Sequence, residues 1–254
     1  MSDYYRVPRH QNWNYSPGVK NNWKLSRSKI ELYISCPKCF YIDNRLGIKQ
    51  PPGYPFNLNS AVDALLKKEF DAHREAKTPH PIMEQNGVDA VPFSHPKIDE
   101  WRENFVGVQT IHEPTGLSVS GAIDDVWVTP DKTLIVADYK ATSKNEEITA
   151  LDKDWQDGYK RQIEIYQWLL RQNGFTVSDT AYFVYANGDT SAPAFNNRLE
   201  FETNLIPYTG NADWVEPVLG KIKECLDGDT VPASDEDCDY CKYRAAVANL
   251  QPPR

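Results

Sequence analysis

The feature that most constrains the fold is a pair of extended segments within residues 121–140, GAIDDVWVTPDKTLIVADYK. A turn sequence, Pro-Asp-Lys at 130–132, separates them. The second segment begins with four consecutive apolar residues at 134–137, which predicts a buried β-strand. We therefore expect two central strands joined as a hairpin.

Two acids and a lysine lie at one end of this predicted hairpin. Asp138 and Lys140 are two residues apart in the second strand, so they share a face of the sheet. Pairing of the strands would bring Asp124 alongside Asp138. Two converging carboxylates suit a hard cation such as Mg²⁺, and a neighbouring lysine can orient a water and stabilise charge on a phosphate. The residues expected on the opposite face are Ile135, Ala137 and Tyr139.

The next periodic segment, residues 155–171, predicts an amphipathic helix. Gln162 and Tyr166 are four residues apart and therefore lie on one face of it. A buried glutamine needs hydrogen-bond partners, so we expect it to hold either a nucleotide phosphate or a neighbouring site residue. The apolar and aromatic residues on the same stripe, which also suit ordinary core packing, are Trp155, Tyr159, Tyr166, Leu169 and Leu170.

Three motifs in this order resemble the RecB-like branch of the PD-(D/E)XK nuclease superfamily. That branch includes the nuclease domains of bacterial helicase–nucleases and the CRISPR-associated RecB-like exonucleases. The resemblance covers roughly residues 117–185. The motifs are Gly-x-x-Asp (Gly121, Asp124), Asp-x-Lys (Asp138, Lys140) and Gln-x-x-x-Tyr (Gln162, Tyr166).

The resemblance implies an α/β fold with a restriction-endonuclease-like core, in which helices flank a mixed central sheet. An N-terminal helical part and a cysteine-clamped C-terminal tail would complete it. The implied activity is metal-dependent hydrolysis of DNA phosphodiester bonds, by in-line attack of a metal-activated water. Lys140 would position or activate that water, and Gln162 and Tyr166 would support the site and the DNA backbone.

The resemblance also implies the metal ligands. Asp124 and Asp138 would bind one or two Mg²⁺ or Mn²⁺ ions, aided by the backbone carbonyl of Tyr139. Members of the family present a histidine near the start of an earlier helix, and Asp63 stands at that place here. Asp63 is therefore either a further metal ligand or an acid that favours the helix dipole. His73 lies nearly three turns farther along the same helix and is not expected to contribute.

Four of the five cysteines form two Cys-x-x-Cys pairs, one near each end of the folded region. Two such pairs can complete one tetrahedral tetrathiolate site. The resemblance implies an iron–sulfur cluster, although the family arrangement is one early and three late cysteines. Structural Zn²⁺ and [4Fe–4S] both remain open. The four residues are Cys36, Cys39, Cys238 and Cys241; Cys225, left over, is expected to be buried.

Composition narrows the class of protein. The chain has 254 residues, an ordinary apolar content of 40% and no segment resembling a signal peptide or membrane span. We expect a cytoplasmic protein. Its net charge of −8 argues against a strong general nucleic-acid binder, but residues 1–29 are locally basic and aromatic. Such a segment either follows a single DNA strand or packs its aromatics on the body. The residues are Tyr4, Tyr5, Arg6, Arg9, Trp13, Tyr15, Lys20, Trp23, Lys24, Arg27 and Lys29.

The expected organisation is an N-terminal arm at 1–25 and a nuclease domain at 26–254, with a catalytic core at about 116–190 and a metal-clamped tail at about 225–245. Ser26 is expected to cap the first helix. A second, long helix is expected from residue 59 or 60 to 76, with an inner face formed by Val62, Leu65, Leu66 and Phe70. The other expected elements are a loop at 78–96, a helix at 98–106, strands at 117–129, 133–140, 180–185 and 199–203, and a helix at 214–226.

Two other functions remain open from the sequence. The fold can serve as a catalytically inactive DNA-binding or partner-docking module, or the cysteine-bound metal can be the main feature, with Asp-x-Lys incidental. The expected partner is DNA. The resemblance suggests DNA repair, recombination, phage or CRISPR-related processing without choosing among them, and any helicase would be a separate chain.

Overall fold

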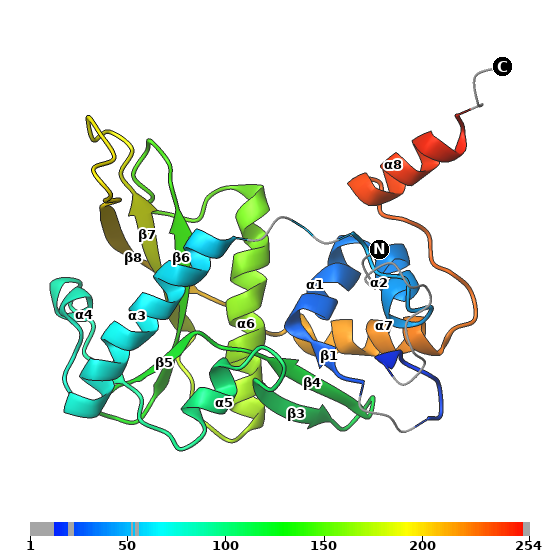
Figure 1. The fold of residues 1–254 in the computed structure, drawn as a ribbon. Helices are drawn as coiled ribbons and strands as arrows, with labels where there is room; N and C mark the ends of the chain where they lie inside the picture. The colour runs from blue at the N-terminus through cyan, green and yellow to red at the C-terminus, as the bar shows by residue number, and fades with distance from the viewer. Residues whose placement is uncertain (1–12, 20–22, 52, 54–55, 251–254) are drawn as a thin grey trace. The chain divides into compact units, whose positions relative to one another are not determined.

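The computed structural model describes residues 13–19, 23–51, 53 and 56–250 of the chain (Figure 1). These residues form two compact units. The sheet unit contains the described residues of 54–110 and 120–212. The cysteine unit contains the described residues of 1–53, 111–119 and 213–254.

A five-stranded mixed sheet forms the centre of the sheet unit, in the order β2-β5-β6-β7-β8. Only β6 and β7 pair in parallel among these neighbours, and the other pairs are antiparallel. This arrangement confirms the expected α/β class with a mixed central sheet. The strands are β2 (Val91–Pro92), β5 (Asp125–Val128), β6 (Leu134–Thr142), β7 (Thr180–Gly188) and β8 (Phe201–Thr209).

Helices cover both faces of this sheet (Figure 1). On one face, α3 (Asn57–Ala76) and α4 (Pro81–Gln85) pack against the side chains of β6 that alternate with the acids. On the other, α6 (Asp157–Gln172) runs along β6 after a 3₁₀ turn at Asp154–Gln156. The core between α3 and the sheet contains Phe70, Met83, Trp127, Ile135, Ala137, Tyr139 and Val184.

The predicted hairpin is present, with a register that positions the acids. Val128 pairs with Leu134, and Asp125 pairs with Ala137. One step beyond the last pair, Asp124 lies opposite Asp138. Lys132 completes the tight turn in the left-handed region, with φ of 72°.

The prediction of one strand over residues 117–129 is wrong, because the chain breaks between β4 (Leu117–Gly121) and β5. β4 belongs to a second sheet of order β1-β4-β3, with β1 at Leu25–Ser26 and β3 at Val108–His112. The break leaves Asp124 outside the ladder, where its side chain can turn toward the site.

Helices organise the cysteine unit. Ser26 caps α1 (Arg27–Ser35) as predicted, accepting a hydrogen bond from the backbone N–H of Lys29 at 3.4 Å. Cys36 ends α1 and begins α2 (Pro37–Asn44), whose first residue is a proline that starts a helix without losing a bond. The later helices of this unit are α7 (Val215–Asp227) and α8 (Asp239–Ala248).

Several expected boundaries differ. Residues 78–96 contain α4 and β2 rather than a plain loop, and the helix expected at 98–106 ends earlier, as α5 (Ile98–Arg102). Phe56, not residue 59 or 60, is the N-cap of α3. Leu65, expected on its inner face, has 63% of its surface exposed, whereas Phe70 is in the core and Leu66 packs against it.

Candidate functional site

Asp138 is the most buried acid of the site, with no exposed surface. Its Oδ1 accepts a hydrogen bond from Nε2 of Gln162 at 2.7 Å, and the same amide donates to the Tyr166 hydroxyl at 3.0 Å. The Gln-x-x-x-Tyr face of α6 therefore contacts a neighbouring site residue, one of the two alternatives left open by the sequence. Oδ2 of Asp138 is also buried, and its contact is the ammonium of Lys140.

Lys140 forms an ion pair with Oδ2 of Asp138, from the next position on the same face of β6. Its ammonium also lies over the ring of Tyr159, 4.6 Å from the centroid. These two contacts hold the lysine ammonium beside Asp138. The sequence placed Tyr159 on the correct helical stripe, but not its contact with Lys140.

Burial and repulsion from Asp124 together raise the pKa of the Asp138 carboxyl to about 7, against the lowering effect of the Lys140 ammonium. A fully buried carboxylate is costly even beside one ammonium group. A divalent cation bound to this carboxylate would lower that cost. The donor set of Asp124 and Asp138 is all oxygen, as Mg²⁺ and Mn²⁺ prefer, so these residues fit such an ion.

Asp124 faces two ways. Its Oδ2 accepts the backbone N–H of Tyr139 at 3.1 Å, and its Oδ1 lies 3.3 Å from Nζ of Lys67. Lys67 also donates to Oδ2 of Asp63 at 2.9 Å. Burial and repulsion from Asp124 raise the pKa of Asp63, although Lys67 opposes this. Burial lowers the pKa of Lys67, but the two carboxylates outweigh it and raise that pKa overall.

Asp125 anchors a buried network directly behind the site. Its Oδ1 lies 2.5 Å from Nη2 of Arg74 and 3.0 Å from Nη2 of Arg102, and its Oδ2 accepts the Tyr139 hydroxyl at 2.8 Å. Arg102 also donates to the backbone carbonyl of Asp124 at 3.1 Å. Tyr139 is therefore held by its backbone N–H and by its hydroxyl group. These two hydrogen bonds fix the position of the β6 segment that carries Asp138 and Lys140.

The sequence interpretation missed Lys67 and the Asp125 network. The four-residue spacing of Asp63 and Lys67 on a helix was a usable signal, because such residues are neighbours. Asp125 lies in a strand position whose alternation points it away from the acids, so an acid there needed a buried partner. Nothing in the sequence identifies the arginines from α3 and α5 as that partner.

Gly121 allows Tyr166 to approach the site, and its substitution gives a first prediction. A Cβ on residue 121 would lie 2.7 Å from Cε1 of Tyr166, which is closer than real contacts allow. We expect Gly121→Ala to lower the free energy of unfolding by about 1–3 kcal/mol and to reduce any activity that depends on Tyr166. Chemical denaturation measures the first effect.

The matched control is Gly220→Ala in α7, where a Cβ meets nothing within 4 Å. Because alanine favours the helix, that variant should be about 0.5–1 kcal/mol more stable than the wild type. Equal stability of Gly121→Ala and the wild type would show that Tyr166 yields without cost.

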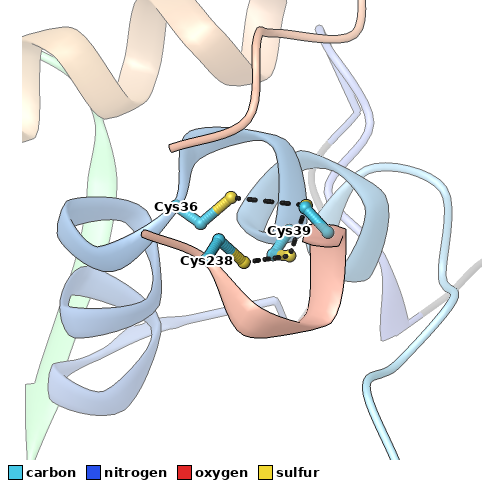
Figure 2. A group of neighbouring side chains, drawn as sticks. Cys36, Cys39 and Cys238 are labelled. Atoms are coloured by element: carbon cyan, nitrogen blue, oxygen red, sulfur yellow. Dashed lines mark hydrogen bonds between the residues drawn. The ribbon is translucent and has the colours of Figure 1, made fainter. Parts of the chain in front are cut away.

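The four cysteines of the predicted tetrathiolate site converge in the cysteine unit (Figure 2). Their sulfur atoms all lie within 4.8 Å of one another. Sγ of Cys39 is 3.6 Å from Sγ of Cys238 and 3.6 Å from Sγ of Cys241, and the Cys36–Cys241 distance is 3.9 Å. Four thiols so close together can bind a metal. Cys225 is only partly buried and lies outside the cluster, so its expected burial is wrong.

One thiol of the cluster is poised to ionise. Burial opposes ionisation of Cys36, but hydrogen bonds from the backbone of Asp235 and Cys39, together with those from the thiols of Cys238 and Cys39, lower the pKa of this thiol to about 7. Thiolates, not thiols, bind metals. The cluster thus starts from a partly ionised ligand at neutral pH.

The N-terminal arm is described only in part, and Tyr4, Tyr5, Arg6, Arg9 and Lys20 lie outside the described residues. Within them, Tyr15 packs edge-on against the buried Trp23, and its backbone N–H bonds to the carbonyl of Asn44 at 2.9 Å. This packing favours the second alternative for the arm, in which its aromatic side chains pack on the rest of the protein.

The prediction for Trp155 is wrong. It was expected on the packed stripe of the helix at 155–171, but 58% of its surface is exposed.

Comparisons with known proteins cover most of the chain. A family model described as the PD-(D/E)XK nuclease superfamily matches residues 24–246. A solved structure described as "Crystal structure of SSO0001" is 14% identical, with a TM-score of 0.37 over 92% of this chain and 90% of that one. No curated protein matches the chain. None of the helices in the described residues has the length and apolarity to cross a membrane.

Proposed function

This chain belongs to the PD-(D/E)XK nuclease superfamily, and from that premise we propose that it is a metal-dependent deoxyribonuclease. The observation that carries the proposal is the convergence of Asp124, Asp138 and Lys140 at the end of the β5–β6 hairpin. Asp124 and Asp138 would hold one or two Mg²⁺ or Mn²⁺ ions with the carbonyl of Tyr139. Asp63, which shares Lys67 with Asp124, is either a further ligand or the partner of that lysine.

Each side chain of the site has a definite task in phosphodiester hydrolysis. When bound, the cation supplies Lewis-acid polarisation of the phosphate and acidifies a water. Lys140, held between Asp138 and Tyr159, stabilises the negative charge that develops on the phosphate and orients the attacking water. Gln162 keeps the Asp138 carboxylate turned toward that water and links it to Tyr166.

The three motifs favour the RecB-like branch within the superfamily, and through it a role in DNA repair, recombination or related DNA processing. A helicase or a recombination or CRISPR protein would then act as a separate partner. The five free cysteines are consistent with a cytoplasmic protein. The division into an arm at 1–25 and a nuclease domain at 26–254 stays a prediction.

Cleavage of end-labelled single- and double-stranded DNA with Mg²⁺ or Mn²⁺ tests the activity. We expect the wild type to cleave and Lys140→Ala to be about 10³-fold slower, because one stabilising group is lost from the reacting phosphate. Lys221→Ala, exposed on α7, is the matched control and should cleave normally. DNA binding without cleavage by the wild type would instead support the inactive DNA-binding module.

We further propose that the cysteine cluster binds a single Zn²⁺ rather than [4Fe–4S]. Four sulfurs at about 2.3 Å from one zinc ion lie about 3.8 Å apart. The Cys39–Cys238 and Cys36–Cys241 distances of 3.6 and 3.9 Å bracket that spacing. A [4Fe–4S] cluster places its irons and sulfides between the thiolates and spreads them farther. We expect the purified protein to be colourless and to contain one zinc ion per chain by elemental analysis. A brown protein that contains iron would overturn the assignment.

A further inference from the structure

Lys67 stands between two carboxylates of the candidate active site. Its Nζ is 2.9 Å from Oδ2 of Asp63 and 3.3 Å from Oδ1 of Asp124. The side chains of all three residues are largely shielded from water, with 23%, 34% and 24% of their surfaces exposed for Lys67, Asp63 and Asp124. A single positive charge from α3 therefore lies against Oδ1 of Asp124 and is shared with Asp63.

From this position we propose that Lys67 is a built-in cation that takes the place of a second divalent metal, so that the active site holds one ion, between Asp124 and Asp138. The inference rests on the proposed nuclease function and adds the number of metal ions to it. Asp63 then acts as the partner that holds Lys67 in place, not as a metal ligand.

Charge balance supports a single ion. Three carboxylates (Asp63, Asp124 and Asp138) and two ammonium groups (Lys67 and Lys140) leave one net negative charge. A scissile phosphodiester adds a second, and one divalent cation neutralises both. A second divalent cation would leave the partly buried site with two uncompensated positive charges, which is unfavourable where water screens poorly.

Geometry leads to the same conclusion. The two ions of two-metal phosphodiesterases lie about 3.5–4 Å apart and flank the attacking and leaving oxygens. Asp124 offers one oxygen to the backbone N–H of Tyr139 and the other to Lys67. A second ion on the α3 side of Asp124 would have to displace the ammonium. The β5–β6 hairpin and α3 both position these groups, so the arrangement does not depend on a flexible loop.

The test is Mn²⁺ binding without DNA, counted by electron paramagnetic resonance of the unbound ion. Mn²⁺ binds thiolates weakly, so the cysteine cluster does not add to the number of Mn²⁺ ions counted. We expect one Mn²⁺ per wild-type chain, two for Lys67→Met, and none at the site for Asp138→Ala. Lys67→Arg keeps the charge and should bind one. Lys68→Met, a neighbour on the same helix outside the site, should also bind one.

Two Mn²⁺ in the wild type, or one in Lys67→Met with unchanged affinity, would overturn the inference. Parallel cleavage assays separate its failure from that of the proposed function. A wild type that cleaves DNA while Lys67→Met still binds one ion leaves the nuclease standing and removes the role of Lys67. A wild type that neither binds Mn²⁺ nor cleaves DNA removes both.

Discussion

Asp138→Asn is expected to abolish cleavage while making the metal-free protein more stable. The amide cannot supply the anionic oxygen that holds the cation, and we expect a loss of about 10⁴-fold, equivalent to about 5.5 kcal/mol of transition-state stabilisation. The same change removes a fully buried carboxylate, whose charge is costly where water is excluded. The amide oxygen can still accept the hydrogen bond from Gln162.

The stability gain should depend on pH, with a sign fixed by the pKa of Asp138. Because the folded-state pKa is raised to about 7, above the unfolded value of about 3.9, the stability contributed by this group is complete below about pH 4. It is lost as the pH rises through 7. Asp138→Asn avoids that loss. The variant should therefore exceed the wild type in free energy of unfolding only slightly at pH 4, and by about 1–2 kcal/mol at pH 8 once the loss of the ion pair with Lys140 is subtracted.

Thermal unfolding at both pH values measures this effect, in buffer freed of divalent cations by resin so that the cysteine-bound metal stays in place. Added Mg²⁺ should stabilise the wild type at pH 8 and leave Asp138→Asn unchanged. Asp131→Asn is the control of opposite sign, because hydrogen bonds from Thr129 and Thr133 lower the pKa of Asp131. If the Asp138→Asn variant is less stable than the wild type at pH 8, burial of the ionised Asp138 carboxylate does not destabilise the protein.

Removal of the Zn²⁺ that we propose for the cysteine cluster is expected to release the C-terminal segment. The described residues of α8 include no buried side chain, so apolar packing contributes little to holding this helix. Cys238, its N-cap, and Cys241 join it instead to Cys36 and Cys39, about 200 residues earlier, as the Cys39–Cys238 separation of 199 shows. A structural metal that closes so long a loop contributes directly to folding.

We expect a strong zinc chelator to make residues 229–250 accessible to proteases and to speed amide hydrogen exchange throughout α8. A loss of about 4 kcal/mol would lower the melting temperature by about 10 °C. Cys238→Ser should reproduce the chelator effect, whereas Cys225→Ser, outside the cluster, should not. An α8 that stays protected after the metal is removed would show that other contacts hold it.

Much of the site was predictable because its signals are short-range. The turn at residues 130–132 fixes the hairpin register, so alternation alone put Asp138 and Lys140 on one face and Tyr139 on the other. Helical spacing put Gln162 and Tyr166 on one stripe. The Cys-x-x-Cys spacing likewise identified each pair of neighbouring cysteines. Each of these relations joins residues only a few positions apart, where backbone geometry leaves few choices.

The sequence by itself determined the α/β class, the hairpin with its acids and lysine, the glutamine–tyrosine face and the cysteine pairs. Only the tertiary structure decided that β4 leaves the central sheet, that Lys67 bridges Asp63 and Asp124, and that two arginines neutralise Asp125. The physical reason is that local periodicity fixes which face a side chain occupies. Which distant charge meets it depends on how whole helices pack, and no local pattern encodes that choice.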